Sequence, residues 1–402
     1  MGDMKPSGVE WIAEIPSEWD DCKPLRFCAN QSSVIGPYEQ GRPYIALDVI
    51  DSWTGKLNPI DEAEQVDSTV ASFTSSDVLF GKLRPYLAKV VRPSFEGQCS
   101  TELLPITPIC LTRDYLFWLL LNKGFIDTVN SGTYGVKMPR TSWRQMGAIY
   151  CPVPPGWEQQ AIAAFLDKKC ASIDVAVSTL EKQIVILERY RTSVIHEAVT
   201  KGLNPEAPMK SSGIDWCNEC PLGWTVLKLK YICNMQSGDA ITSESVFEEG
   251  KFPVYGGNGL RGYTERFNTV RDSILIGRQG ALCGNVHLAR APFWASDHAI
   301  VVEEKTQLDR KFFYYQLLSM NLNSLSMTAA QPGISVSTVM GQKVLLPSIE
   351  EQRDIVCFLD TRIAAIDSIL ETKRKQIDVL KRRRQSLIYE CVTGKRRVGK
   401  EI

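Results

Sequence analysis

Two long segments of this chain carry apolar residues at alternating intervals of four and three positions. Residues 157–201 and 348–393 contain neither Gly nor Pro, so each can form one uninterrupted helix. The heptad spacing predicts that each helix buries a single apolar seam against a partner helix. The predicted seam consists of Ile173, Val177, Leu180, Ile184 and Leu187 in the first helix and of Ile366, Leu370, Ile377, Leu380 and Leu387 in the second.

Charged side chains interrupt both seams. Arg191 stands at a seam position of the first helix, and Lys373 and Arg384 stand at seam positions of the second. A helix of ~40 residues is about 60 Å long at a rise of 1.5 Å per residue. The simplest partner for each helix is the other helix, and the alternative is a helical hairpin that packs onto its own domain.

Short β-rich runs separated by Gly- and Pro-rich loops fill the rest of the chain. Strands are expected at residues 78–80, 88–91, 273–276 and 299–302, and helices at 115–121 and 312–318. This mixture predicts an α+β fold with an irregular sheet that could close into a barrel.

The chain contains an internal repeat. Residues 7–11 recur as residues 212–216, and residues 158–200 share 21 of 43 positions with residues 351–393 without a gap. The segments between these matching stretches are less similar. The two copies share apolar positions there, whereas the polar residues at the ends of the apolar runs differ. The order is therefore globular part, helix, globular part, helix.

Composition narrows the class of protein. At 402 residues the chain should form two or three domains, and no apolar run is long enough to span a membrane. We expect a cytoplasmic protein whose twelve cysteines are reduced thiols. Cys217 and Cys220 form a lone CxxC without the second ligand pair that a zinc site needs, so we interpret the pair as structural.

Charge is balanced overall but not locally. There are 46 basic and 46 acidic side chains, yet residues 371–400 hold eleven Lys or Arg against three acidic residues. Such a run is usually a solvated helix face, and it could also contact phosphates or an acidic partner.

Several motifs, taken in order, resemble those of one family, the specificity (S) subunits of type I restriction-modification systems. They are Leu79 to Tyr86, Cys99 to Glu102, Glu158-Gln159 with Phe165-Leu166-Asp167 and Ile173-Asp174 and their repeat, Pro253 to Gly259, and Ile276 to Gly280. The resemblance covers most of the chain.

The resemblance implies a domain plan. It assigns residues 1–155 and 212–347 to two target recognition domains, residues 156–201 and 348–394 to helical spacers, residues 202–211 to a linker and residues 395–402 to a basic tail. Each domain would read one half of a split, asymmetric site in double-stranded DNA. The helices would pair as an antiparallel coiled coil, hold the domains apart and dock two methyltransferase subunits.

The resemblance also implies that catalysis lies elsewhere. Restriction subunits, which act as translocase and nuclease, would join the complex, and the S subunit itself would carry no catalytic residue, metal or cofactor. S-adenosylmethionine, ATP and Mg²⁺ would serve the partner subunits.

Candidate DNA contacts are basic, amide or aromatic side chains in loops, since phosphates attract cations and base edges need forked donors. In the first domain they are Lys82, Arg84, Tyr86, Thr133, Tyr134, Lys137 and Arg140. In the second domain they are Tyr255, Asn258, Arg261, Tyr263, Arg278, Gln279 and Gln331, with Arg278 and Gln279 as the leading pair for reading bases. Plain surface loops and tight turns are the alternatives, and His298 is expected to be a hydrogen-bonded structural residue.

Two rival functions compete. A self-contained DNA-modifying enzyme would need a Gly-rich cofactor loop with an Asn/Asp-Pro-Pro-aromatic motif or a Walker A motif, and the sequence shows neither. A coiled-coil scaffold without DNA binding would explain the heptads but not the Gly-rich polar loops in both globular parts.

Overall fold

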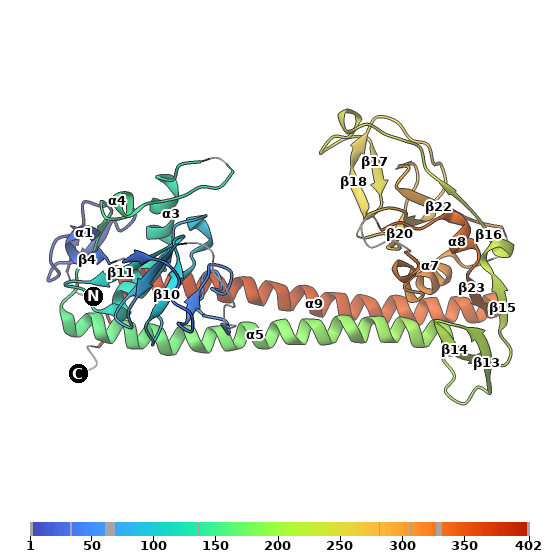
Figure 1. Cartoon of the computed structure of the whole chain (residues 1–402). Helices are drawn as coiled ribbons and strands as arrows, with labels where there is room; N and C mark the ends of the chain where they lie inside the picture. Colours follow the sequence, from blue (N-terminus) through green and yellow to red (C-terminus); the bar gives the residue numbers. More distant parts are fainter. Residues whose placement is uncertain are drawn as a thin grey trace. The chain divides into compact units, whose positions relative to one another are not determined.

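The computed structural model describes residues 3–32, 34–60, 69–135, 137–280, 282–305, 308–326 and 332–399. Contacts divide the chain into two compact units: unit 1 comprises residues 1–181 and 373–402, and unit 2 comprises residues 182–372. Each unit therefore contains one globular part and one part of each long helix (Figure 1). We call the globular parts head 1 (residues 3–155) and head 2 (residues 209–347).

Head 1 begins with an antiparallel hairpin and continues into two small four-stranded sheets. The hairpin is β1 (Met4–Pro6) with β2 (Glu14–Pro16), and β3 (Lys23–Pro24) pairs with β12 (Tyr150–Cys151). The first sheet, all antiparallel, has the order β4 (Ala29–Gln31), β11 (Leu103–Pro108), β8 (Val78–Gly81), β9 (Val90–Val91). The second has the order β5 (Ile35–Gly36), β7 (Val70–Phe73), β10 (Gly97–Ser100), β6 (Tyr44–Ile45), in which β10 and β6 are parallel.

Four α-helices and one 3-10 turn complete the described part of head 1. They are α1 (Leu25–Cys28), η1 (Pro85–Leu87), α2 (Arg113–Leu120), α3 (Lys123–Ser131) and α4 (Trp143–Met146). Six of the eight residues of α2 are buried, which makes this helix the centre of the apolar core of head 1.

Head 2 repeats this plan. A hairpin of β13 (Met209–Ile214) and β14 (Cys217–Pro221) comes first, and β15 (Thr225–Lys228) pairs with β23 (Lys343–Leu346). A four-stranded sheet has the order β16 (Cys233–Ser237), β22 (Ala299–Glu304), β19 (Ser273–Gly277), β20 (Val286–Ala289). A three-stranded sheet has the order β18 (Gly259–Thr264), β17 (Phe252–Gly256), β21 (Trp294–Ala295). The helical segments are α6 (Leu229–Ile232), η2 (Ser243–Ser245), α7 (Arg310–Ser319), η3 (Leu322–Leu325) and α8 (Val336–Met340).

The fold agrees with the predicted α+β mixture, with two corrections. Strand pairs in each head are divided among several small sheets, and none of the sheets among the described strands closes into a barrel. The predicted linker at residues 202–211 is too long, because residues 209–211 already pair with β14. The reason is that Met209 to Ser211 take their hydrogen-bonding partners from residues 219–221, which a linear pattern does not reveal.

The two predicted long helices are confirmed as α5 (Gly156–Lys201) and α9 (Ile349–Val392) (Figure 1). Each ends at a glycine with left-handed backbone, Gly202 and Gly394, both at φ 74°. This conformation terminates helices and favours glycine because it has no Cβ. At the start of α9, the Ser348 hydroxyl accepts a hydrogen bond from the Glu351 amide at 3.2 Å, which caps the first turn.

The helices pack together inside each unit. In unit 1 the early part of α5 (Ile162, Leu166) shares an apolar core with the end of α9 (Ile388, Val392). In unit 2 the end of α5 (Val194, Val199) packs on the early part of α9. All ten predicted seam residues are buried or half-buried, as a seam requires.

Two of the three charged residues that interrupt the seams, Arg384 and Arg191, form cross-helix ion pairs. In unit 1, Arg384 Nε lies 3.0 Å from Asp174 Oδ1, and in unit 2, Arg191 Nε lies 2.9 Å from Asp367 Oδ1. Asp174 and Asp367 are repeat equivalents, as are Arg191 and Arg384. The interruptions in the apolar pattern are therefore the same polar contact made once in each unit.

Other repeated residues also make repeated contacts. The buried carboxylate of Glu158 accepts a hydrogen bond from the indole of Trp19 at 2.8 Å, and Glu351 accepts one from Trp224 at 3.0 Å. Both carboxylates lie in the first turn of a long helix, where the helix dipole favours negative charge. These contacts fix the N-terminal part of each head onto a helix start.

A repeated glutamine joins each head to its helix in the same way. Gln159 accepts a hydrogen bond from the backbone amide of Thr112, the N-cap of α2, and donates one to Pro154. Gln352 accepts one from the amide of Asp309, the N-cap of α7, and donates one to Pro347. Because these amides are buried, the identity of the two glutamines follows from hydrogen bonding rather than from DNA recognition.

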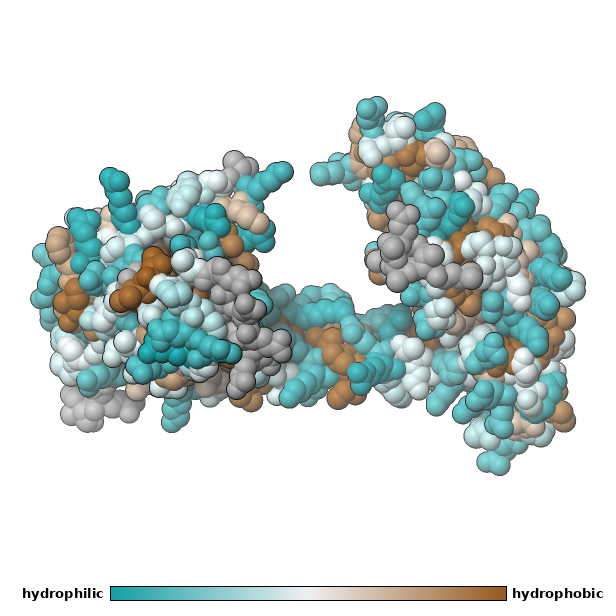
Figure 2. All heavy atoms as spheres, in the orientation of Figure 1, coloured by the Kyte–Doolittle hydropathy of each residue, from teal (hydrophilic) through white to brown (hydrophobic). Residues whose placement is uncertain are grey.

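Part of the helix surface remains apolar. Val175, Ile186 and Val379 are 67%, 63% and 53% exposed. Figure 2 shows hydrophobic atoms interrupting the hydrophilic surface of the long helices. Exposed apolar patches are typical of surfaces that a partner covers.

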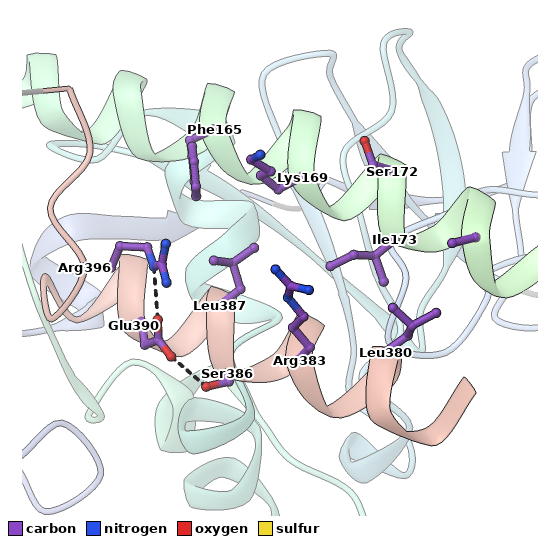
Figure 3. A pocket seen from close by; sticks show the side chains of 11 residues that line it. Phe165, Lys169, Ser172, Ile173, Leu380, Arg383, Ser386, Leu387, Glu390 and Arg396 are labelled. Atoms are coloured by element: carbon purple, nitrogen blue, oxygen red, sulfur yellow. Dashed lines mark hydrogen bonds and ion pairs between the residues drawn. The ribbon is translucent and has the colours of Figure 1, made fainter. Parts of the chain in front are cut away.

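A groove also opens in unit 1 between α5 and the last turns of α9 (Figure 3). Its volume is about 560 Å³, and Phe165, Ile173 and Leu387 are among the side chains that line it.

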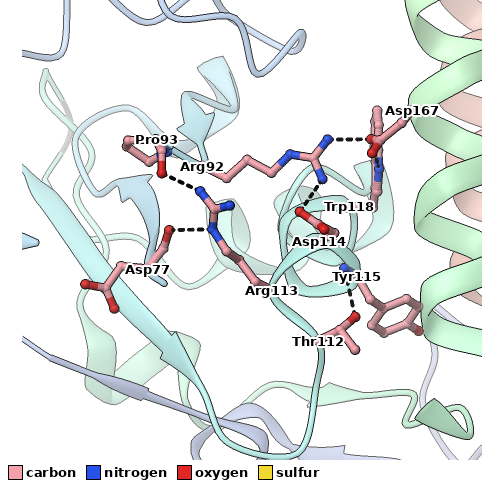
Figure 4. A network of polar contacts seen from close by, with 9 residues as sticks. All are labelled: Asp77, Arg92, Pro93, Thr112, Arg113, Asp114, Tyr115, Trp118 and Asp167. Carbon is pink, nitrogen blue, oxygen red and sulfur yellow. Dashed lines mark hydrogen bonds and ion pairs between the residues drawn. The ribbon is translucent and has the colours of Figure 1, made fainter. Parts of the chain in front are cut away.

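An arginine network fastens head 1 to α5 (Figure 4). Arg92 bridges Asp114 at 2.6 Å and Asp167 at 2.5 Å, and Asp167 also accepts a hydrogen bond from the Trp118 indole. Arg113 donates to the carbonyl oxygens of Pro93 and Asp77. In unit 2, Asp360, the equivalent of Asp167, is bound instead by Tyr315 and Lys311.

The basic run near the C-terminus is partly structural. Arg397 pairs with Glu158 at 3.0 Å and with Glu18 at 2.6 Å, and Arg396 pairs with Glu390. Tyr115 donates a hydrogen bond to the carbonyl oxygen of Val392. The end of the chain therefore folds back onto head 1.

Arg384 should contribute more to stability than its repeat equivalent Arg191. Its side chain is 7% exposed, and it also donates hydrogen bonds to the carbonyl oxygens of Trp53 at 2.7 Å and Thr54 at 3.1 Å. Replacing Arg384 with Met strands these buried acceptors and should lower the free energy of unfolding by about 2–4 kcal/mol. The pair of Arg191 is more exposed, so Arg191→Met should cost at most ~1 kcal/mol.

Urea denaturation of both variants measures this difference. Equal losses for Arg384→Met and Arg191→Met would contradict the assigned role of Arg384.

Candidate nucleic-acid interface

The two predicted contact segments of head 1 lie side by side. The amide of Arg84 donates to the carbonyl oxygen of Pro139 at 2.7 Å, and the amide of Thr141 donates to that of Lys82 at 2.9 Å. Leu83 and Arg140 form an isolated β-bridge. Residues that are some fifty positions apart therefore form one surface at the end of β8.

Local backbone geometry turns this segment outward. Arg84 has a left-handed conformation with φ 50°, which is uncommon for a residue with a Cβ. It precedes η1, whose first residue, Pro85, is buried. The chain thus leaves β8 sharply, and the Arg84 and Tyr86 side chains are exposed.

The predicted residues of head 1 divide into two groups. Arg84, Tyr86, Tyr134 and Lys137 are exposed, and Lys82 is half-buried. Arg140 is instead held by Glu102, at 3.1 Å and 3.3 Å from its two carboxylate oxygens, and Thr133 donates to the carbonyl oxygen of Asn130. Arg140 and Thr133 therefore shape the loop, while the exposed group is available to a ligand.

Sequence reasoning missed the role of Glu102. A carboxylate whose two oxygens accept hydrogen bonds from two nitrogens of one guanidinium fixes its orientation. The sequence feature that could have indicated this role of Glu102 is its position in the segment Ser100 to Glu102. This segment corresponds to Ser296 to His298 in the second copy of the repeat.

In head 2 the Gly-rich loop is the turn of the β17–β18 hairpin. Gly259 has φ 84°, a conformation that favours glycine. A Cβ on Gly277 would lie 2.0 Å from the carbonyl oxygen of Gly257, and a Cβ on Gly257 would lie 2.8 Å from that of Gln279. These glycines are needed because the hairpin turn lies directly against the end of β19.

This close approach forms a pocket of about 370 Å³ at the hairpin turn. Four polar side chains line it, those of Asn258, Arg261, Gln279 and His298, and all four residues are exposed. Gly256, Gly257, Gly280 and Leu282 complete the lining. Amide, guanidinium and imidazole groups supply the donors and acceptors that read the edge of a base pair.

Internal hydrogen bonds orient part of this set. Asn258 Oδ1 accepts a hydrogen bond from Asn285 at 2.9 Å, so its amide donor faces away from that partner. Arg261 donates to the Ser243 hydroxyl at 3.3 Å through one nitrogen only. Each side chain therefore retains donor capacity for a ligand.

The leading candidate, Arg278, is not part of the pocket lining. Its Nη1 donates to the Ser237 hydroxyl at 3.1 Å and lies 3.4 Å from the carbonyl oxygen of Asp297. Of the pair Arg278 and Gln279, only Gln279 lines the pocket. The two side chains diverge because consecutive residues of an extended chain point to opposite faces.

The two predicted tyrosines of head 2 also lie apart from the pocket. Tyr255 packs edge to face against Phe293 at 5.4 Å between ring centroids, and burial raises the pKa of its phenol. Tyr263 is half-buried, and its backbone forms an isolated β-bridge with Phe247. Gln331 falls outside the residues that the structure describes.

The ring of His298 differs from the expectation of a hydrogen-bonded structural residue. The ring of His298 lines the pocket and makes no hydrogen bond to any described residue, since its contacts to Ser296 and Arg278 are through the backbone. His287 lies under the hairpin turn, with Nε2 buried and without a described partner. Burial lowers the pKa of His287, which keeps its imidazole neutral at neutral pH.

Within the described ranges, no three His, Cys, Asp or Glu side chains gather in a way that could hold a metal ion. Cys217 and Cys220 are buried in β14. None of the helices described is both long and apolar enough to cross a membrane.

Comparison with known proteins finds similarity to type I restriction-modification specificity proteins. Residues 221–379 match the family model described as the type I restriction modification DNA specificity domain. The chain is 37% identical over 147 residues to the type I restriction enzyme EcoprrI specificity subunit of Escherichia coli, which covers 36% of this chain and 37% of that protein. It is 26% identical over 313 residues to the MjaVIII specificity subunit of Methanocaldococcus jannaschii, covering 71% of this chain and 70% of that one.

The match thus spans little more than a third of the EcoprrI subunit. The fold is similar over a much greater length. A solved chain from a study of complex assembly and conformational transition of the type I R-M system gives a TM-score of 0.74 at 18% identity, covering 95% of this chain and 99% of that one. The HsdS subunit of Thermoanaerobacter tengcongensis gives 0.51 at 19% identity, with 95% and 98% covered.

Residues 221–379 therefore match a type I restriction modification DNA specificity domain, and the chain shares its fold with solved chains from type I restriction-modification systems.

Proposed function

We propose that this chain is the recognition subunit of a type I restriction-modification complex, and that each head reads one half of a split, asymmetric DNA site. The observation that carries the proposal is the head 2 pocket, where Asn258, Arg261, Gln279 and His298 converge on one opening. Amide and guanidinium groups are the side chains that discriminate base edges in the major groove. Among the described residues that line this pocket none is acidic, so none of them repels a phosphate.

The comparison of the two heads supports reading of two different half-sites. Their strands and anchoring contacts correspond, yet the exposed side chains at the equivalent tips do not: head 1 presents Arg84, Tyr86 and Lys137, and head 2 presents Gln279 and His298. Two different base sequences require different exposed side chains on the same arrangement of strands.

The long helices act as the spacer in this proposal, paired as one antiparallel coiled coil. Support comes from the ion pairs, whose residue numbers have the same sum in both units: 174 + 384 = 558 and 191 + 367 = 558. A single antiparallel register satisfies both. A helix of 46 residues is about 69 Å long, which exceeds the ~34 Å between successive major-groove faces.

The same helices would dock two methyltransferase subunits, and restriction subunits would join them. The exposed apolar residues of α5 and α9 are suited to such partners. In this proposal the chain itself performs no catalysis, and S-adenosylmethionine, ATP and Mg²⁺ act in the partner subunits. The protein as a whole would act in the cytoplasm on double-stranded DNA.

Gln279 should determine the identity of one base pair. Replacing it with Ala removes a paired donor and acceptor and should lower discrimination at one position of one half-site by about 1–3 kcal/mol, roughly 5- to 150-fold. The measurement is methylation of a randomised site library by the complex. The matched control is Arg278→Ala, whose guanidinium is bound inside head 2; it should lower stability and leave the base preference unchanged. Relaxation by Arg278→Ala but not by Gln279→Ala would reverse the assignment.

Lengthening the coiled coil should change the distance between the half-sites. Seven residues inserted after Glu181 and seven after Thr372 preserve the heptad seam and add about 10 Å to each helix. The preferred spacing should grow by about one to three base pairs while both half-site sequences stay the same. A control with seven residues added after Leu203, outside the helices, should keep the original spacing. A spacing that does not respond to the helical insertion would refute the spacer role.

A further inference from the structure

Three cysteines from distant parts of the sequence gather in head 1. Cys28 ends α1, Cys110 lies in the turn between β11 and α2, and Cys151 ends β12. Strand pairing brings them together, because β4, which directly follows Cys28, pairs with β11, and Cys151 pairs with Lys23 just before α1 (Figure 1). The backbone amide of Cys110 donates to the carbonyl oxygen of Cys28 at 3.3 Å, and Cys151 Sγ lies 3.3 Å from that of Lys23.

The thiol of Cys28 is the centre of this cluster. Cys28 and Cys151 are fully buried, whereas Cys110 is exposed. Hydrogen bonds from the thiols of Cys151 and Cys110, together with the ammonium group of Lys23, stabilise the thiolate and lower the pKa of Cys28 to about 7, although burial opposes them. The thiolate is the form of cysteine that attacks an oxidised sulfur atom. The cluster therefore holds a readily ionised thiol beside a thiol that solvent can reach.

The second copy of the repeat provides an internal comparison. Cys233 is the repeat equivalent of Cys28, and extending the gap-free alignment of the long helices maps Cys151 onto Val344. The Cys233 thiol donates to the carbonyl oxygen of Leu229 at 3.3 Å, and burial raises its pKa to about 12. A cysteine at the same place in the fold thus remains a protonated thiol when its neighbours differ.

The turn that carries Cys110 also holds head 1 on α5. The carbonyl oxygen of Cys110 accepts a hydrogen bond from the Gln159 side chain at 3.4 Å. The amide of Thr112, two residues later, donates to the same side chain at 2.6 Å. A displacement of Cys110 would therefore act on the first turn of α5.

We propose that Cys28 and Cys110 form a reversible disulfide when the protein meets hydrogen peroxide, and that this bond loosens the attachment of α2 to the start of α5. Cys28 is fixed in the core of head 1, so the exposed turn moves toward it and draws Cys110 and Thr112 away from Gln159. This redox site is independent of the proposed function, because it requires neither DNA nor a partner subunit.

One molecule of hydrogen peroxide balances the reaction. The Cys110 sulfur attacks a peroxide oxygen while its proton passes to the Cys28 thiolate; an S–O bond forms, the O–O bond breaks, and the departing hydroxide takes a proton from solvent. The Cys28 sulfur then attacks the Cys110 sulfenic acid and gives its proton to the departing hydroxyl group, so that the S–S bond forms and the S–O bond breaks. In total, two thiols lose two electrons and two protons, and peroxide becomes two water molecules.

Peptide mass spectrometry of the full-length chain tests for the disulfide. The protein is treated with hydrogen peroxide, free thiols are blocked with iodoacetamide, and peptides are compared with and without reduction. A linked pair of peptides that contain Cys28 and Cys110 should appear, and dithiothreitol should reverse it. Cys233 should stay reduced under the same conditions.

Three variants separate the roles of the thiols, and circular dichroism checks that each one folds. Cys110→Ser should abolish the linked pair. Cys151→Val introduces the residue of the second copy and removes a donor to Cys28, so the pair should form about three- to tenfold more slowly. The matched control is Cys22→Ser, which removes a neighbouring thiol that does not bond to Cys28, and it should leave the rate unchanged.

Hydrogen exchange tests the effect on the helix. The Thr112 amide should exchange about tenfold faster in the oxidised protein than in the reduced one, because its bond to Gln159 opens more often. Peroxide should not change this exchange in Cys110→Ser.

Three results would overturn the redox site: no linked pair, a pair between Cys28 and Cys151 in its place, or equal rates in Cys151→Val and the unchanged protein. Exchange at Thr112 that stays the same after the disulfide has formed would overturn the effect on α5.

Discussion

The ion pair between Arg384 and Asp174 joins three parts of unit 1. Arg384 comes from α9 and Asp174 from α5, and the same guanidinium holds the carbonyl oxygens of Trp53 and Thr54 in head 1. It also lies 5.5 Å from the ring centre of Trp118. A charge this deeply buried is tolerated only where partners surround it, so the position of head 1 on the helices depends on keeping all of these contacts together.

The same physical logic separates two classes of repeated residue. Glutamates, glutamines and the aspartate–arginine pairs recur because each closes a hydrogen bond between a head and a helix, or between two helices. The exposed side chains at the tips of the heads make no such hydrogen bond to a helix, and they differ between the two heads. The division between constant and variable positions thus follows from where hydrogen bonds are buried, and it agrees with a protein whose frame serves common partners while its tips serve different ligands.

The sequence predicted the parts of the fold that depend on local pattern. The two long helices follow from heptads free of Gly and Pro, and β8, β19, β22, α2 and α7 follow from short apolar runs. The charged residues Arg191 and Arg384, which interrupt the seams, could also be identified from the sequence. Their pairing with Asp367 and Asp174 could not, because it depends on the register between the two helices. The end of the linker was misplaced because Met209 pairs with Pro221 across a hairpin.

The candidate site was predicted less completely, because it depends on side-chain direction. Gln279 and Arg278 are adjacent in the chain, yet Ser237 and Asp297 hold the arginine away from the pocket. No local sequence pattern indicated that residues 82–86 would lie beside residues 133–140. Nor did any indicate that Glu102 would bind the guanidinium of Arg140.

The central claim is that two different heads on one repeated frame read one split site. The most direct measurement is the mapping of methylated bases in DNA from cells that carry this chain with the methyltransferase subunit proposed as its partner, compared with cells that carry that subunit alone. The account predicts a single motif with two unlike half-sites separated by a fixed number of unspecified base pairs, present only when this chain is present. A continuous motif, two identical half-sites, or methylation that does not depend on this chain would contradict it.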